Sequence, residues 1–219
     1  MTRRLRVAVL ASGRGSNLRA ILDSIDSGRL DAEVEVVISN TPGCLALDRA
    51  SQAGIPVGCI TKKAAGGRVN QLARIHRALV ESDVDLVVHA GFNLILSTET
   101  VNHFKNRMVN IHPSLLPAFA GGMNPKPQRD AIEYGVKVSG CTVHLVTEEV
   151  DAGPILAQST VPVFDDDTPE SLASRILAEE HKILPRVIQW FSEDRVRVDG
   201  RTVCILPKPV HERPVGAAG

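Results

Sequence analysis

The sequence predicts an α/β protein with a Rossmann-like open, mostly parallel sheet flanked by helices and an antiparallel extension in the C-terminal half. Residues 5–11 form a nearly continuous apolar run that ends before Gly13, which is typical of a strand buried on both faces. Similar runs alternate with stretches of helical periodicity up to about residue 91. Beyond residue 108 two longer runs alternate apolar and polar residues, as in an antiparallel ribbon.

Helices follow the apolar runs of the first half. Apolar residues recur at helical spacing after Ser16, so we expect the first helix to begin there. Gly28 is expected to end it. Strands that alternate with helices in this way imply right-handed crossovers and an open parallel sheet. In such a sheet we expect ligands at the carboxyl ends of the strands. The remaining elements of this half are a strand at 34–39 with a helix near 44–53, a strand at 56–60 with a helix over about 69–81, and a strand at 85–91.

The second half contains a long loop between regular elements. Proline and glycine are frequent from Pro113 to Pro127, so we expect no regular element there and interpret the segment as an active-site loop. Thr168 and Ser171 begin a helix with inward-facing apolar positions. The other expected elements are a strand at 108–112, a short helix over about 129–134, strands at 138–146 and 154–163, and a hairpin around Asp199–Gly200.

Composition favours one cytoplasmic domain with small-molecule partners. Lys+Arg and Asp+Glu are equal at 25 each, and no stretch is strongly basic, so nothing indicates nucleic-acid binding. The apolar runs are shorter than the roughly 20 residues that span a bilayer, so we expect no membrane partner. The cysteines are too dispersed for a disulfide framework or a zinc site, and we expect core thiols at Cys44, Cys59, Cys141 and Cys204.

The first candidate site is the glycine turn at residues 12–17, SGRGSN. Its glycines let the backbone approach an anion, and Ser16 and Asn17 lie at the start of a helix. Position 18 is Leu rather than the third glycine of a dinucleotide motif, so a single phosphate fits better. A tight turn with a helix cap and no ligand is the alternative.

The second candidate is Asn110 with His112, at the carboxyl end of a predicted strand. Alternate side chains of a strand point to the same face, so the amide and the imidazole can act on one carbonyl. A structural histidine is the alternative. The other histidines lack metal-ligand spacing, so we predict no metal site and structural or surface roles for His76, His89, His103, His144 and His181.

The third candidate is Asp151, in the acidic turn 148–155. Such turns are ordinarily solvated, and only a carboxylate beside His112 changes that interpretation. A negative charge there raises the pKa of the imidazole, because it favours the protonated ring. The sequence does not establish that the two residues are close.

Together these motifs resemble the phosphoribosylglycinamide formyltransferase family, folate-dependent enzymes of purine synthesis. The likeness covers roughly residues 5–195. It is carried, in the order and spacing of that family, by SGRGSNL (12–18), AGF (90–92), ILS (95–97), NIHPSLLP (110–117), VHLVTEEVDAGPILAQ (143–158) and EEH before ILP (179–185).

The resemblance implies transfer of the formyl group of 10-formyltetrahydrofolate, a co-substrate, to the amine of 5'-phosphoribosylglycinamide (GAR). It implies one domain over 1–219, with a phosphate-binding half (1–105), a catalytic and folate-binding half (106–195) and a C-terminal hairpin and tail (196–219), and it leaves a homodimer open. The implied catalytic residues are Asn110, His112 and Asp151. The implied substrate-binding residues are Gly15, Ser16, Asn17 and Glu180. The implied folate-binding residues are Arg68, Asn93, Leu94, Ile95, Leu96, Asn110, Thr147, Glu148, Glu149, Val150 and Asp151.

The chain departs from the family pattern at three places. Asn93 and Leu94 replace the usual Met-Arg, the loop 118–130 is longer and lacks a histidine often found there, and Leu177 replaces a polar contact of some relatives.

The resemblance implies a chemical role for each catalytic residue. Asn110 donates to the developing oxyanion, and His112, held protonated by Asp151, donates to that oxygen or to the leaving nitrogen. Asp151 alternatively relays the proton of the amine through water.

Three other functions are alternatives. A formyltetrahydrofolate deformylase passes the formyl group to water and usually has an extra domain in front of the first strand, which is expected here near residue 5. Methionyl-tRNA formyltransferase adds a C-terminal domain and a basic surface, whereas this sequence is neutral. A noncatalytic nucleotide-binding regulator needs only the glycine turn, and has no use for Asn110 and His112 at a strand end.

Overall fold

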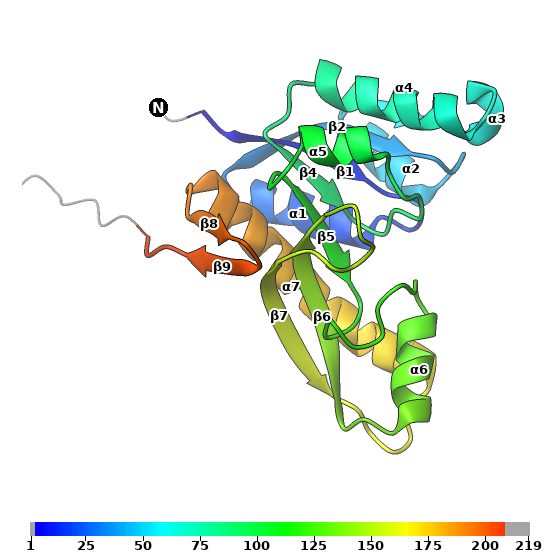
Figure 1. Ribbon diagram of the computed structural model, residues 1–219, viewed down its shortest axis with the longest axis vertical. Helices are drawn as coiled ribbons and strands as arrows, with labels where there is room; N and C mark the ends of the chain where they lie inside the picture. Colours follow the sequence, from blue (N-terminus) through cyan, green and yellow to red (C-terminus); the bar gives the residue numbers. More distant parts are fainter. Residues whose placement is uncertain (1–2, 209–219) are drawn as a thin grey trace, which may run out of the picture.

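A computed structural model describes residues 3–208, which form a seven-stranded sheet with helices on both faces and a separate two-stranded hairpin (Figure 1). The strand order is β3-β2-β1-β4-β5-β6-β7. The first five strands pair in parallel, and β6 and β7 continue the sheet antiparallel to β5. The predicted fold class is confirmed.

The strands lie close to the predicted ranges. The parallel strands are β1 (Leu5–Leu10), β2 (Ala32–Ser39), β3 (Val57–Cys59), β4 (Leu86–His89) and β5 (Met108–His112). The antiparallel pair consists of β6 (Val138–Leu145) and β7 (Ile155–Pro162), and the hairpin of β8 (Val196–Asp199) and β9 (Thr202–Ile205). The part of the predicted tail beyond residue 208 lies outside the described residues.

Two helical layers cover the sheet. On one face, α1 (Ser16–Asp26), α2 (Leu45–Gln52), α6 (Lys126–Tyr134) and α7 (Pro169–Ser192) contribute to one buried cluster. On the other face, α4 (Arg68–Glu81) and α5 (Thr98–His103) contribute to a second cluster, and the short α3 (Lys62–Ala65) precedes α4.

The central strand β1 supplies side chains to both layers. Val7 and Val9 pack in the first cluster, whereas Ala8 and Leu10 pack in the second, and all four are fully buried. Successive residues of a strand point to opposite faces, so a strand between two helical layers must be apolar throughout. This explains the continuous apolar run.

Some predicted boundaries and burials are wrong. The helix expected from about residue 129 begins at Lys126, because Pro127 occupies its first turn, where the missing N–H is not needed. The helices α3 and α5 were not predicted, since four and six residues are too few to establish a period. Cys59 and Cys204 are exposed on short strands rather than in the core, whereas Cys44 and Cys141 are buried.

The long helix α7 begins as predicted. Thr168 accepts a hydrogen bond from the backbone N–H of Ser171, whose side chain accepts from the backbone N–H of Thr168. This reciprocal cap satisfies donors that a helix start leaves free. Within residues 3–208, no helix is long and apolar enough to cross a membrane.

Candidate active site

A cavity of about 900 Å³ lies at the carboxyl ends of β1, β4 and β5. The glycine turn before α1 lines one end, and Asn110, His112 and Asp151 line the other. Glu180 reaches it from α7. The structure therefore brings the three motifs identified in the sequence into one space, at the sheet edge where open parallel sheets bind ligands.

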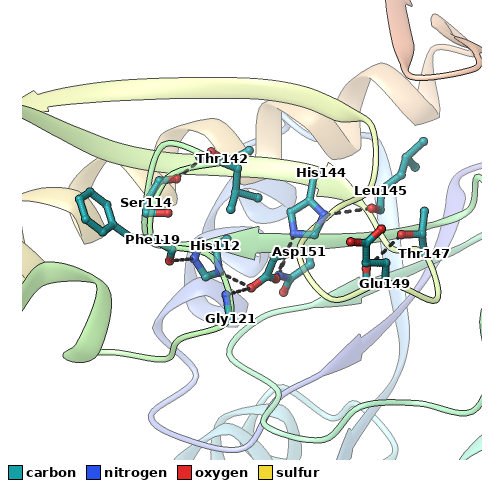
Figure 2. Close-up of polar contacts among 12 residues, drawn as sticks. His112, Ser114, Phe119, Gly121, Thr142, His144, Leu145, Thr147, Glu149 and Asp151 are labelled. Atoms are coloured by element: carbon teal, nitrogen blue, oxygen red, sulfur yellow. Dashed lines mark hydrogen bonds and ion pairs between the residues drawn. The ribbon is translucent and has the colours of Figure 1, made fainter. Parts of the chain in front are cut away.

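Asp151 lies directly against His112, as the family resemblance implied (Figure 2). Its Oδ2 atom is 3.2 Å from Nδ1 of His112 and accepts a 2.8 Å hydrogen bond from the backbone N–H of Gly121. The two residues come from strand β5 and from the turn between β6 and β7. The alternative of a solvated turn is therefore wrong for this carboxylate, whose side chain is only 11% exposed.

The turn that carries Asp151 is held tightly to the strand end. Asp151 has a φ of 52°, a left-handed conformation that aspartate adopts more readily than most residues. A Cβ on Gly153 would lie 1.8 Å from the carbonyl oxygen of Leu145, so only glycine permits this close approach. The backbone N–H of Leu145 donates to the carbonyl of Pro154 across the same turn. These contacts direct the carboxylate toward β5.

The environment of His112 differs from the sequence-based expectation. Burial lowers the pKa of His112, and this effect outweighs the opposing effects of the Asp151 charge and the Phe119 carbonyl. The expectation that Asp151 raises the pKa of this ring above its usual value is thus wrong, although the carboxylate acts in the expected direction. Burial also raises the pKa of Asp151, but contacts with His144, Gly121 and His112 outweigh burial and lower it.

The loop after β5 occupies the second nitrogen of His112. Nε2 lies 3.1 Å from the carbonyl oxygen of Phe119, and Nδ1 faces the carboxylate of Asp151. Both partners are acceptors, so a neutral ring can donate to only one of them, whereas the protonated ring can donate to both. A substrate that uses Nε2 must displace the Phe119 carbonyl.

His144 is a cavity residue that the sequence patterns did not single out. It pairs with Asn110 across β5 and β6, and its Nε2 lies 3.1 Å from Nδ2 of Asn110 and 3.6 Å from Oδ1 of Asp151. Its Nδ1 faces the carbonyl of Leu145 at 2.9 Å, so a neutral ring donates there and accepts from Asn110. The alternation of the 138–146 strand could have indicated which of its side chains share a face with His144. It does not determine which residue of the neighbouring strand lies opposite His144.

Asn110 keeps one amide hydrogen available. The contact with His144 uses one hydrogen of Nδ2, and the other points to Oδ1 of Asp151 over 3.5 Å, too long for a strong bond.

His89, also predicted to be structural or on the surface, lines the cavity, and burial lowers its pKa to about 4.

The opposite end of the cavity is built around the start of α1. Gly15 has a φ of 68°, and a Cβ there would lie 2.7 Å from the Cα of Ala46, so glycine is required for both reasons. Ser16 and Asn17 follow as the first helical residues. Backbone N–H groups of a first helical turn are free to bind an anion.

Asn17 is bonded to Glu180 of α7. Its Nδ2 donates a 2.7 Å hydrogen bond to Oε2 of the carboxyl group, and both side chains are buried. Burial raises the pKa of Glu180, and the bond from Asn17 only partly opposes this. Oδ1 of Asn17 is buried without a partner in the part of the chain that the structure describes. Buried acceptors are rarely left unpaired, so this oxygen suits a donor on a ligand.

The residues expected to contact folate differ in whether they line the cavity. All but one line the cavity: Asn93, Leu94, Ile95, Leu96, Asn110, Thr147, Glu148, Glu149, Val150 and Asp151. Arg68 does not line the cavity; it begins α4, and its guanidinium donates to Gln71. Between residues 3 and 208, no group of three or more side chains is arranged to hold a metal ion.

Sequence comparison identifies the family. A model of the formyl transferase family matches residues 5–188. The chain belongs to this family. It is 38% identical to the phosphoribosylglycinamide formyltransferase of Escherichia coli over 194 residues, which cover 89% of this chain and 90% of that protein. The crystal structure of glycinamide ribonucleotide transformylase 1 from Symbiobacterium toebii matches with a TM-score of 0.90 and 45% identity, over 94% of this chain and 96% of that one.

The chain also matches part of a much longer protein. It is 43% identical over 196 residues to the trifunctional purine biosynthetic protein adenosine-3 of Homo sapiens. That match covers 90% of this chain and 19% of the human protein. The chain thus spans about a fifth of the length of this relative, but nearly the whole of the bacterial one.

Proposed function

We propose that this family member transfers the formyl group of 10-formyltetrahydrofolate to the amine of GAR in purine synthesis, giving formyl-GAR and tetrahydrofolate. The observation that carries the proposal is the meeting of Asn110, His112 and Asp151 at one end of a cavity whose other end is the glycine turn. The names of the Escherichia coli and Symbiobacterium toebii proteins support the choice of substrate.

At the phosphate end, the backbone from Gly15 to Asn17 holds the phosphate of GAR. A helix start favours a negative ligand without a cationic side chain. Glu180 and the free Oδ1 of Asn17 accept hydrogen bonds from the ribose hydroxyls, which supplies the missing donor for that buried oxygen. The amine of GAR then extends toward Asn110.

At the catalytic end, the amine nitrogen attacks the formyl carbon and negative charge develops on the formyl oxygen. Asn110 donates its available amide hydrogen to this oxygen, a contribution of roughly 2.7 to 4 kcal/mol at comparable sites. The carbon then breaks its bond to nitrogen 10 of the folate. That nitrogen must gain a proton as the amine loses one.

Asp151 and His112 move the proton in this proposal. The lowered pKa of Asp151 keeps it ionised at neutral pH, so it accepts the amine proton through a water molecule. The 3.2 Å contact passes a proton to His112, which protonates the leaving nitrogen after Phe119 has moved aside. His144 positions Asn110 through the 3.1 Å contact.

The folate is expected along the wall formed by residues 93–96 and 147–151, with backbone groups of these segments as its partners. The proposal treats residues 1–219 as one formyltransferase domain in the cytoplasm. GAR and 10-formyltetrahydrofolate are its two small-molecule partners.

The proposal is tested by measuring release of tetrahydrofolate from 10-formyltetrahydrofolate with and without GAR. We expect release that depends on GAR and yields formyl-GAR in equal amount. Equal release without GAR indicates a deformylase. No release in either case leaves a noncatalytic binding role.

A further inference from the structure

Three polar side chains close a ring across the carboxyl ends of β1, β2 and β4. Ser12 Oγ donates to Asn40 Oδ1 at 2.6 Å, and Asn40 Nδ2 donates to Asn93 Oδ1 at 2.8 Å. The backbone N–H of Asn93 completes the ring by donating to Ser12 Oγ at 3.1 Å. The backbone N–H of Ser12 also donates to the carbonyl of Gly91. Each member is therefore held by the other two.

The ring joins the two walls of the cavity. Ser12 is the first residue of the glycine turn at the phosphate end, and Asn93 begins the segment 93–96 at the folate end. Asn93 lines the cavity, whereas Ser12 and Asn40 are not among the described residues that do. Any effect of Asn40 on a ligand must then pass through the ring.

We propose that Asn40 and Asn93 are positioning residues whose ring couples binding of GAR at one end of the cavity to binding of folate at the other. The inference rests on the proposed function. Ordering a loop costs free energy on binding, and a connection between two loops lets the first ligand order both. The second ligand then binds to a segment that is already fixed.

The size of the coupling follows from the bonds involved. Asn40→Ala removes two of the three side-chain bonds of the ring, and the net worth of one such bond corresponds to a change in affinity of about threefold to tenfold. Neither Asn40 nor Ser12 lies in the cavity, so kcat should stay within about twofold while KM rises for both substrates.

Isothermal titration with tetrahydrofolate, alone and with saturating GAR, measures the coupling directly. We expect wild type to bind tetrahydrofolate about threefold to tenfold more tightly with GAR present. In Asn40→Ala, Asn93→Ala and the double variant, the ratio should be close to one. Asn70→Ala, an exposed asparagine on α4, is the matched control and should keep the wild-type ratio.

The double variant distinguishes the ring from direct contact with ligand. If Asn93 acts through the ring, Asn93→Ala adds nothing in the Asn40→Ala background. Multiplicative losses, or a wild-type ratio of one, would overturn the inference while leaving formyl transfer intact. Binding of neither ligand to wild type would overturn the proposed function as well. Should Asn40→Ala unfold, Ser12→Ala decides instead, because its hydroxyl makes two bonds of the ring and Ser12 is not among the described residues that line the cavity.

Discussion

The two ends of the cavity differ in the chemical groups that line them. The phosphate end uses backbone N–H groups at the start of α1 and one buried amide–carboxyl pair, Asn17 with Glu180. The catalytic end gathers titratable side chains from β5, β6 and the turn after β6. Backbone donors keep their state at every pH, whereas side-chain groups exchange protons. The first end is thus suited to binding and the second to chemistry, and variants should separate KM from kcat.

The largest effect is expected at the catalytic end, for Asp151→Asn. This change keeps the shape but removes the carboxylate that we propose receives the amine proton, so kcat should fall a hundredfold or more, about 2.7 kcal/mol of barrier. KM for both substrates should change little. Steady-state kinetics measures both, with Asp165→Asn as the control, since that exposed carboxylate pairs with Lys137 away from the cavity. Near-normal turnover would reduce Asp151 to a structural residue.

At the phosphate end, Asn17→Ala should act on binding instead. Removing the amide takes away a bond to Glu180 and the acceptor proposed for the ribose, and bonds to charged groups are worth about 1.5 to 3 kcal/mol. We expect KM for GAR to rise at least tenfold with kcat within about threefold. The same kinetics check this, and an unchanged KM in a folded variant would break the distinction between the two ends.

The pH dependence of stability should report on His89, between the two ends. Its pKa is about 4 in the folded chain and 6.5 in the unfolded chain, so only the unfolded chain takes up this proton near pH 5. Stability from this group is present above pH 6.5 and is lost as pH falls toward 4, by about 2 kcal/mol between pH 7 and pH 5. Denaturant unfolding of wild type and His89→Asn measures it. The loss attributable to this residue should disappear in the variant.

The smallest effect is expected for the N-terminal cap of α7, the helix that carries Glu180. Thr168→Ala removes the cap of α7 and should lower the free energy of unfolding by about 1 kcal/mol. Glu180 lies several turns away, so kinetic constants should remain those of wild type. Chemical denaturation with parallel kinetics checks both. A changed KM for GAR would show that the position of the helix start is transmitted to the cavity.

The sequence was most informative where geometry is local. The apolar run of β1, the glycine turn at Gly15 and the Thr168 cap each depend on a few neighbouring residues, and each was correctly predicted. The placement of Asn110 and His112 on one face follows from strand alternation alone.

Long-range register was not accessible in the same way. His144 lies opposite Asn110 only because β5 and β6 pair in one particular register, and the sequence does not state which. The pKa of His112 depends on how deeply the loop around Phe119 buries it, and a proline- and glycine-rich segment does not reveal its path. Burial therefore reversed an expectation that considered only the nearby charge.

The fate of the formyl group tests the central claim most directly. A ¹³C-labelled formyl group on 10-formyltetrahydrofolate can be followed by NMR during a reaction with equimolar GAR. The account predicts that the label appears in the new amide of formyl-GAR, with one tetrahydrofolate released for each amide formed, and that Asp151→Asn slows this transfer at least a hundredfold. Label that appears as free formate at a rate independent of GAR would contradict it.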